Sequence, residues 1–284
     1  MKVRAMAQSP AVTTTSPAPP DRLTLIAISA LAYLIAVGVH EHLGHTAACI
    51  LLGSHPLEVG AFYVNCDNSS LSDMRIRLVA LAGPLIELAL GLACFAVLRR
   101  LPRRADAAPY FVWLLGSISL MSSTGYLLFS GLTGLGDFGV SPDGMLYQIE
   151  PAWLWQIVLT IVGLVSYVLI IIFSVRAIEP YIGGTGRARI RYARLMALAS
   201  YLTGAVLYLV IGLLNPYGLI IVVISAAASS LGATAGLLWM MQLLDRKRDV
   251  AAPGMVVRRS WRWIALAGVV TIAYAVILGP TLRF

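Results

Sequence analysis

The sequence has few charged residues for its size. Asp, Glu, Lys and Arg make up 12% of its 284 residues, whereas a typical soluble domain contains about 25%. Hydrophobic residues make up 59%, and the mean hydropathy is +0.83. Several apolar runs reach the roughly 20 residues that a helix needs to cross a bilayer. The composition therefore argues against a soluble globule and predicts an integral membrane protein, with the lipid bilayer as its first partner.

Cysteine is also scarce. Only Cys49, Cys66 and Cys94 are present, and no two of them form a CxxC pair. Metal sites built from thiolates use closely spaced cysteines, and disulfide-rich domains contain many more of them. The sequence therefore predicts neither a disulfide framework nor a thiolate metal site, and we expect the three side chains to serve in packing.

The positive charge does not indicate nucleic acid. The net charge is +8, but the arginines lie in short clusters beside apolar runs, as the positive-inside rule of membrane proteins leads one to expect. We therefore predict no nucleic-acid partner.

The apolar runs predict an all-α membrane protein with about seven spans. They cover roughly residues 22–53, 75–98, 109–132, 152–178, 192–214, 217–244 and 261–280. Basic clusters precede the first span, follow the second, and separate the fourth from the fifth and the sixth from the seventh. This alternation predicts a multi-pass protein of the cell membrane with a cytoplasmic N-terminus and an external C-terminus.

The chain divides into three predicted parts. Residues 1–21 are rich in Pro, Ser, Thr and Ala and predict a disordered cytoplasmic tail. Residues 22–145 form a core of three spans, and residues 146–284 form a C-terminal bundle of four. After the first span, 55-HPLEVGAFYVNCDNSS-70 contains β-prone residues bounded by turn formers, which predicts a short external strand or hairpin.

All four histidines, His40, His42, His45 and His55, fall in one short segment. An ionisable residue in a membrane helix is costly and indicates function, and imidazole is a common zinc ligand. The sequence therefore predicts a zinc site here. The alternative is a hydrogen-bonded histidine patch at a helix end. Four histidines are too few for the histidine boxes of a membrane di-iron oxygenase.

The spacing leaves the ligand pair open. In a regular helix, at about 100° per residue, Glu41, His42 and His45 share a face and His40 lies to the side. The HExxH zinc motif places its histidines at i and i+4, but His40 and His45 are at i and i+5. They share a face only if the helix contains a π-bulge.

Three acidic residues are candidates to complete the site. Asp137 follows the third span, and the predicted topology brings it to the same external side as the histidines. Asp143 lies in a Pro-Asp-Gly turn and is the other candidate ligand, although an ordinary turn role is favoured. Glu87, within the second span, is a candidate outer-shell partner, proton relay or ligand. Its alternative is a neutral buried carboxyl.

These segments resemble the site-2 protease family of intramembrane zinc metalloproteases. The resemblance rests on 39-VHEHLGHTAA-48, on 80-ALAGPLIEL-88 and on the aspartate in 136-GDF-138. It implies that His40 and His45 are zinc ligands, that Glu41 is the base, that Asp137 completes the zinc site, and that Glu87 replaces an asparagine. His42 makes the motif HExxxH rather than HExxH, and Asp137 lies in GLGDFG rather than the family's LDG context.

The sequence thus predicts an intramembrane zinc metalloprotease that hydrolyses membrane-protein clients, with a substrate helix as its partner. Glu41 would act as general base on zinc-bound water. The alternative is an inactive relative that binds metal or client helices without cleaving them. A metal transporter is disfavoured, because Glu87 is the one strong ionisable candidate in the spans outside the cluster.

Overall fold

The computed structural model describes residues 19–102, 107–184, 186–244 and 254–284. Most of the predicted N-terminal tail lies outside these ranges. Asp21, the last residue of that tail, is described. It caps the first helix by accepting a hydrogen bond from the Thr24 backbone N–H at 2.9 Å, and it pairs with Arg259 at 2.8 Å. An N-cap aspartate satisfies a free N–H of the first helical turn, so Asp21 is held at the start of that helix.

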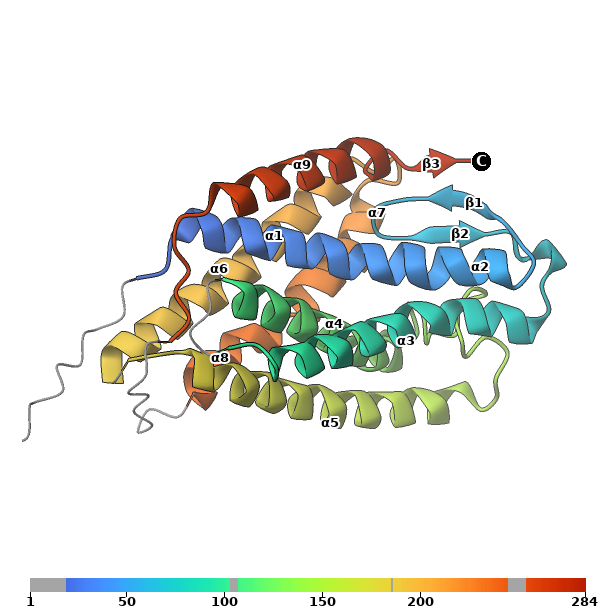
Figure 1. Ribbon diagram of the computed structural model, residues 1–284. Coiled ribbons are helices and arrows are strands. Elements are labelled where there is room, and N and C mark those ends of the chain that lie inside the picture. The colour runs from blue at the N-terminus through green and yellow to red at the C-terminus, as the bar shows by residue number, and fades with distance from the viewer. Residues whose placement is uncertain (1–18, 103–106, 185, 245–253) are drawn as a thin grey trace, which may run out of the picture.

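The fold is a bundle of long helices with a small sheet at one end (Figure 1). The α-helices are α1 (Arg22–Gly38), α2 (Ala47–Leu51), α3 (Asp73–Leu98), α4 (Ala108–Thr133), α5 (Ala152–Ile178), α6 (Gly186–Gly212), α7 (Leu219–Ile221), α8 (Met240–Leu243) and α9 (Trp261–Leu278). Other helical turns are the π-helices η1 (Val39–Thr46) and η4 (Val222–Gly232), and the 3₁₀ helices η2 (Asn68–Ser70), η3 (Glu179–Tyr181) and η5 (Ala235–Trp239).

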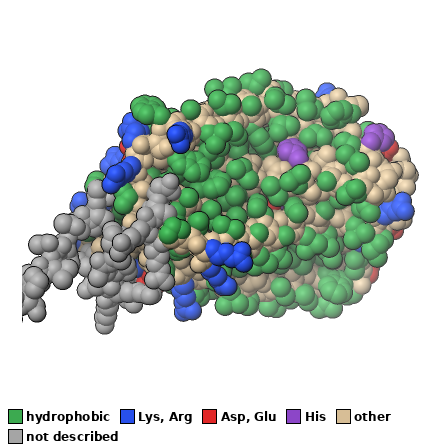
Figure 2. All heavy atoms as spheres, viewed as in Figure 1, with side chains coloured by type: hydrophobic (Ala, Val, Ile, Leu, Met, Phe, Trp, Pro, Cys, Tyr) green, Lys and Arg blue, Asp and Glu red, His purple; other side chains and the backbone are tan. Residues whose placement is uncertain are grey.

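Six helical stretches among the described residues are long and apolar enough to cross a membrane. They are Arg22–Leu51, Asp73–Leu98, Ala108–Thr133, Ala152–Tyr181, Gly186–Gly212 and Trp261–Leu278. These helices fit a multi-pass membrane protein and match six of the seven predicted spans. Figure 2 shows hydrophobic side chains over much of the long side of the bundle, as a lipid-facing surface requires.

The sixth predicted span, residues 217–244, is not one regular helix. It is broken into α7, η4, η5 and α8, and it passes from the sheet end of the bundle to the opposite end (Figure 1). The hydroxyls of Ser229, Ser230 and Thr234 each donate to the carbonyl four residues earlier. Such back-bonding bends helices, but Ser29 and Ser200 make the same bond within the regular helices α1 and α6, so it does not by itself explain the departure from the predicted single helix.

The sheet confirms the predicted hairpin and adds a strand from the C-terminus. Strands β1 (Pro56–Val59) and β2 (Val64–Cys66) pair antiparallel, and β3 (Leu282–Arg283) pairs antiparallel with the other edge of β1. The Arg283 guanidinium also pairs with Glu58 on β1 at 3.1 Å. The C-terminus is thereby fixed at the sheet end, whereas α1 begins at the opposite end, which we call the arginine end (Figure 1).

The sequence predicted a packing role and no disulfide for the three cysteines, and this was wrong for two of them. Cys49 of α2 and Cys66 of β2 form a disulfide, while Cys94 is free and buried. The pair has a sequence separation of 17 and no motif, so its formation depends on the hairpin folding back over the end of the first long helix. The bond ties β2 to the helix that contains the histidine cluster.

The core is built around α1. Leu25, Ile28 and Tyr33 have no exposed surface, and α1 packs against α4, α6 and α9. Two tyrosine hydroxyls in this core are hydrogen-bonded within it. The Tyr33 hydroxyl donates to Thr234, and the Tyr208 hydroxyl donates to the Tyr33 carbonyl, both at 2.7 Å. In hydrocarbon an unsatisfied polar group is expensive, so these bonds also specify how α1 and α6 pack.

Candidate metal centre

The π-helix brings His40 and His45 together. Residues 39–46 form η1, in which hydrogen bonds run from i to i+5, so residues five apart lie on one face. The two Nε2 atoms are 3.0 Å apart, and both side chains are buried. This is the local geometry that the HExxxH spacing requires.

His42 points elsewhere. Its ring lies 6.3 Å from the ring of Tyr274 on α9, and its Nε2 atom has no hydrogen-bond partner among the described residues. Of the three histidines that were candidates for ligands, the structure therefore groups His40 with His45 and leaves His42 apart.

A close contact between two glycines makes room for the two rings. A Cβ atom on Gly44 of η1 would lie 2.6 Å from the Cα atom of Gly83 on α3. A Cβ atom on Gly83 would in turn overlap the rings of both His40 and His45. The glycine of the Ala-Gly-Pro segment therefore forms the floor beneath the two imidazoles.

Asp137 approaches the same point from the loop after α4. Its Oδ2 atom lies 3.2 Å from His40 Nε2, and its Oδ1 atom lies 3.4 Å from His45 Nε2. The loop is folded back by its own hydrogen bonds, including one from the Met145 N–H to the Asp137 carbonyl at 2.8 Å. Asp143, the other candidate from this loop, instead accepts a hydrogen bond from Asn68 at 2.6 Å.

The outer nitrogens of both rings are already engaged. His45 Nδ1 lies 2.8 Å from the Val79 carbonyl oxygen, and His40 Nδ1 lies 3.1 Å from Glu87 Oε2. A carbonyl only accepts hydrogen bonds, so His45 must carry its proton on Nδ1, and an ionised Glu87 sets the same tautomer in His40. Glu87 thus occupies the outer position that carboxylates commonly take behind a metal-binding histidine.

The inward-facing atoms have the arrangement of a metal-ligand set. With the protons on Nδ1, both Nε2 atoms present lone pairs to each other and to a carboxylate, a combination that repels unless a cation or a proton lies between them. The separation of 3.0 Å between the two nitrogens, and those of 3.2 and 3.4 Å from them to the two different oxygens of Asp137, are each close to the edge of about 3.3 Å in a tetrahedron whose metal bonds are about 2.0–2.1 Å. His40, His45 and Asp137 therefore fit three ligands of a tetrahedral ion.

Glu41 completes this group without being one of its closest atoms. A carboxylate oxygen of Glu41 and one nitrogen each of His40 and His45 lie within 4.8 Å of one another. Glu41 is 4% exposed, and no hydrogen bond to its carboxylate is recorded among the described residues. A buried carboxylate beside the ligands, with free lone pairs, is placed to exchange a proton with a molecule bound next to it.

The charges around Asp137 favour its ionised form. Burial by itself would raise the pKa of the Asp137 carboxyl, but positive charge on the imidazoles of His45 and His40, when they are protonated, lowers that pKa below its usual value. A carboxylate that stays ionised when buried is suited to bind a cation.

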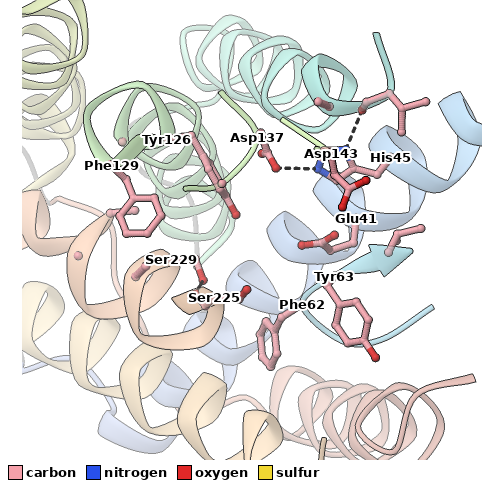
Figure 3. Close-up of a pocket in the computed structure, with 18 of the residues that line it drawn as sticks. Glu41, His45, Phe62, Tyr63, Tyr126, Phe129, Asp137, Asp143, Ser225 and Ser229 are labelled. Carbon is pink, nitrogen blue, oxygen red and sulfur yellow. Dashed lines mark hydrogen bonds and ion pairs between the residues drawn. The ribbon is translucent and has the colours of Figure 1, made fainter. Parts of the chain in front are cut away.

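A cavity of about 590 Å³ opens in front of this group. Glu41, His45 and Asp137 form one wall, Phe62 and Tyr63 lie beside β2, and Ser225 and Ser229 of η4 lie opposite (Figure 3). Tyr126 of α4 extends into the same space (Figure 3), and its ring stacks on His40 at 4.7 Å between centroids. Most of the lining is apolar, so the cavity suits an apolar chain segment more than a small polar solute.

Sequence reasoning did not identify Tyr126, Gly83 or the η4 wall as parts of the site. Tyr126 lies in an apolar run with no motif around it, and η4 begins 85 residues after Asp137 along the chain. The Ala-Gly-Pro segment resembles that of a known family in sequence, but the space that Gly83 leaves for the rings depends on how α3 crosses η1. Comparison of the chain with family models, with curated proteins and with solved structures found no match.

Proposed function

We propose that this chain is a multi-pass membrane metalloprotease that uses zinc to hydrolyse peptide bonds in apolar segments of membrane-protein clients. The observation that carries the proposal is the convergence of His40 Nε2, His45 Nε2 and Asp137, with separations of 3.0–3.4 Å, while both outer ring nitrogens are held by other acceptors. This donor set fits a catalytic zinc ion, which takes three protein ligands and leaves one position open.

When bound, zinc would supply an acidified water molecule and polarise the scissile carbonyl. The residues of the chain account for the remaining steps. Glu41, in the cavity wall, accepts a proton from the attacking water and returns it to the nitrogen of the leaving amine. The C–N bond of the peptide breaks with the uptake of one water molecule, which yields one carboxylate and one amine. Glu87 and the Val79 carbonyl hold the two imidazoles in the tautomer that presents Nε2 inward.

The cavity supports a peptide substrate. Its lining combines apolar side chains of α3 and α4 with the edge strand β2, and it also includes Asn68 and Asp143. An apolar segment of a client would remain in apolar surroundings while its scissile bond lies next to Glu41. The Tyr126 hydroxyl extends into this space (Figure 3), and we propose that it donates a hydrogen bond to the carbonyl of the bound peptide.

We further propose that the sheet end faces the outside of the cell membrane. The arginine clusters at the other end support this orientation through the positive-inside rule. The Cys49–Cys66 disulfide at the sheet end supports it independently, because disulfides persist in oxidising compartments. Reporter fusions at Asn65 and in the loop of residues 99–104 test it: external and internal signals, respectively, are expected, and the reverse pattern would overturn the orientation.

Cleavage is tested with the purified protein in detergent and a set of quenched fluorescent peptides with apolar sequences. We expect cleavage by the wild type, loss on adding a zinc chelator, recovery with added zinc, and loss in Glu41→Gln. If a zinc-loaded wild type cleaves none of the peptides, and membrane clients co-reconstituted in vesicles also remain intact, the non-catalytic metal-binding alternative would replace this proposal.

A further inference from the structure

A second cavity lies at the arginine end, far along the bundle from the candidate metal centre. It has a volume of about 360 Å³ and is bounded by the C-terminal ends of α3 and α5. Phe95 and Leu98 of α3 and Phe173 of α5 form its apolar floor, and the rings of Phe95 and Phe173 are 4.6 Å apart. Arg99 and Arg176 are the two charged residues in its lining. This cavity combines an aromatic floor with two guanidinium groups at the rim.

The two arginines are available to an anion. Both are exposed, and neither has an acidic side chain within ion-pair distance among the described residues. Free carbonyls at the end of α3 would repel an anion, but the Tyr181 hydroxyl already donates to the carbonyls of Leu98 and Leu101. Figure 2 shows basic side chains gathered over the ends of α3 and α5. The local charge is therefore positive.

Each arginine is at the end of an exposed apolar stripe. On α3, Leu92, Ala96 and Arg99 are all exposed and are spaced i, i+4, i+7, so they lie on one helix face. On α5, Leu169, Phe173 and Arg176 have the same spacing, with Leu169 59% exposed. Two apolar stripes, one on α3 and one on α5 that includes the half-buried Phe173, thus each lead to a guanidinium group.

We propose that this cavity binds the phosphate headgroup of an anionic phospholipid, with the acyl chains lying along the two stripes. Arginine binds phosphate oxygens through paired N–H donors, and basic pockets between membrane helices on the cytoplasmic side are suited to anionic headgroups. A free phosphate ion would gain nothing from the aromatic floor or the stripes, so the geometry favours a lipid. The positive-inside rule accounts for arginines at this end, but not for their position around an apolar cavity.

The test uses delipidated full-length protein in a neutral detergent and follows its thermal unfolding as a ligand is added. The probes are phosphatidylglycerol, phosphatidylcholine and inorganic phosphate. The variant is Arg99→Gln/Arg176→Gln, and the matched control is Arg187→Gln/Arg191→Gln, which removes two exposed arginines from the same end that do not line the cavity. Arg99→Lys/Arg176→Lys keeps the charge and shows whether the altered side chains still permit folding.

For the wild type and the control, we expect phosphatidylglycerol to raise the unfolding temperature more than phosphatidylcholine does. In the Arg→Gln variant its apparent affinity should fall at least about tenfold, since each basic residue near a membrane surface contributes on the order of one kcal/mol toward anionic lipid. The Arg→Lys variant should recover part of that affinity. An equal loss in the control would reduce the effect to general surface charge. An equal shift with inorganic phosphate would indicate a soluble anion site, and no preference for phosphatidylglycerol would eliminate the site; each of these results would overturn the proposal.

Discussion

The first and the fourth long helical stretches differ little in sequence character but greatly in burial. Arg22–Leu51 and Ala152–Tyr181 each have 30 residues, with mean hydropathies of 2.1 and 2.8 in their most apolar windows. Yet 72% of the first window is buried inside the protein, compared with 17% of the fourth. Hydropathy cannot separate the two cases, because lipid tails are as apolar as a protein core. The position of the ionisable residues differs: the buried stretch contains the cluster of His40, Glu41 and His45, whereas Arg176 and Glu179 of the exposed stretch lie in its last turns.

The largest effect is expected for a substitution of Glu41, one of the polar residues in the buried stretch. Glu41→Gln keeps the size of the side chain but removes the proton acceptor, so peptide cleavage should fall by about 10²–10⁴-fold. The bound zinc should remain, because Glu41 is not among the atoms closest to both histidines and Asp137. Initial cleavage rates and metal content measured on the same preparation check this. Cleavage within threefold of wild type would assign the base to another group.

Leucine truncation on the two stretches tests the contrast in burial. Leu25→Ala on α1 removes a side chain with no exposed surface, and it should lower the free energy of unfolding by about 2–5 kcal/mol. Leu169→Ala on α5 removes one that is 59% exposed, and it should change that free energy by no more than about 0.5 kcal/mol. Unfolding in detergent and denaturant measures both. Equal losses would mean that the outer face of α5 is covered in the folded protein.

The disulfide should stabilise the sheet end. Closing a loop of about 15 residues contributes about 3 kcal/mol by restricting the unfolded chain, and Cys49 and Cys66 have a sequence separation of 17. A reductant should therefore lower the unfolding temperature of the wild type and of Cys94→Ala, but not of Cys49→Ala/Cys66→Ala. Thermal scans with and without reductant check this. A wild type that reductant leaves unchanged, although thiol labelling shows that the bond has been reduced, would contradict it.

Substitutions of two glycines, Gly83 and the control Gly268, test whether the site needs the space beneath the two imidazoles. In Gly83→Ala the new methyl group would overlap both imidazoles, and overpacking of this kind costs about 1–3 kcal/mol. We expect a weakened metal affinity as well as the loss of stability. Gly268→Ala on α9 introduces the same methyl group into open space and should leave both properties near wild type. Zinc titration and thermal unfolding of the two variants distinguish these outcomes. An unchanged zinc affinity in Gly83→Ala would show that the site does not need a glycine beneath the two imidazoles.

Much of the candidate site could be predicted because its residues are costly where they lie. Histidine and glutamate near the end of a membrane span are conspicuous against an apolar background, and the i, i+5 spacing of His40 and His45 already required a π-bulge. The grouping of Asp137 with the histidines followed from the direction of two spans. These inferences needed only local geometry and the alternation of charge.

The remaining features depend on contacts between distant segments. The pairing of Cys49 with Cys66 requires the hairpin to fold over α2, and the pairing of β3 with β1 brings together residues more than 200 positions apart. The break in the sixth predicted span was not predicted, because the apolar composition of residues 217–244 resembles that of a regular span. The stacking of Tyr126 on His40 depends on the packing of α4 against the first long stretch. None of these features leaves a periodic or motif-like trace in the sequence.

The central claim is that His40, His45 and Asp137 hold one metal ion, and the metal content of the purified protein tests it most directly. Elemental analysis should compare wild type with His45→Ala, Asp137→Ala, Glu41→Gln and the control His42→Ala. The account predicts one zinc per chain in the wild type, in Glu41→Gln and in His42→Ala, and its loss in the other two variants. A wild type that remains free of metal after incubation with zinc, or a zinc ion that is lost in His42→Ala and kept in Asp137→Ala, would contradict it.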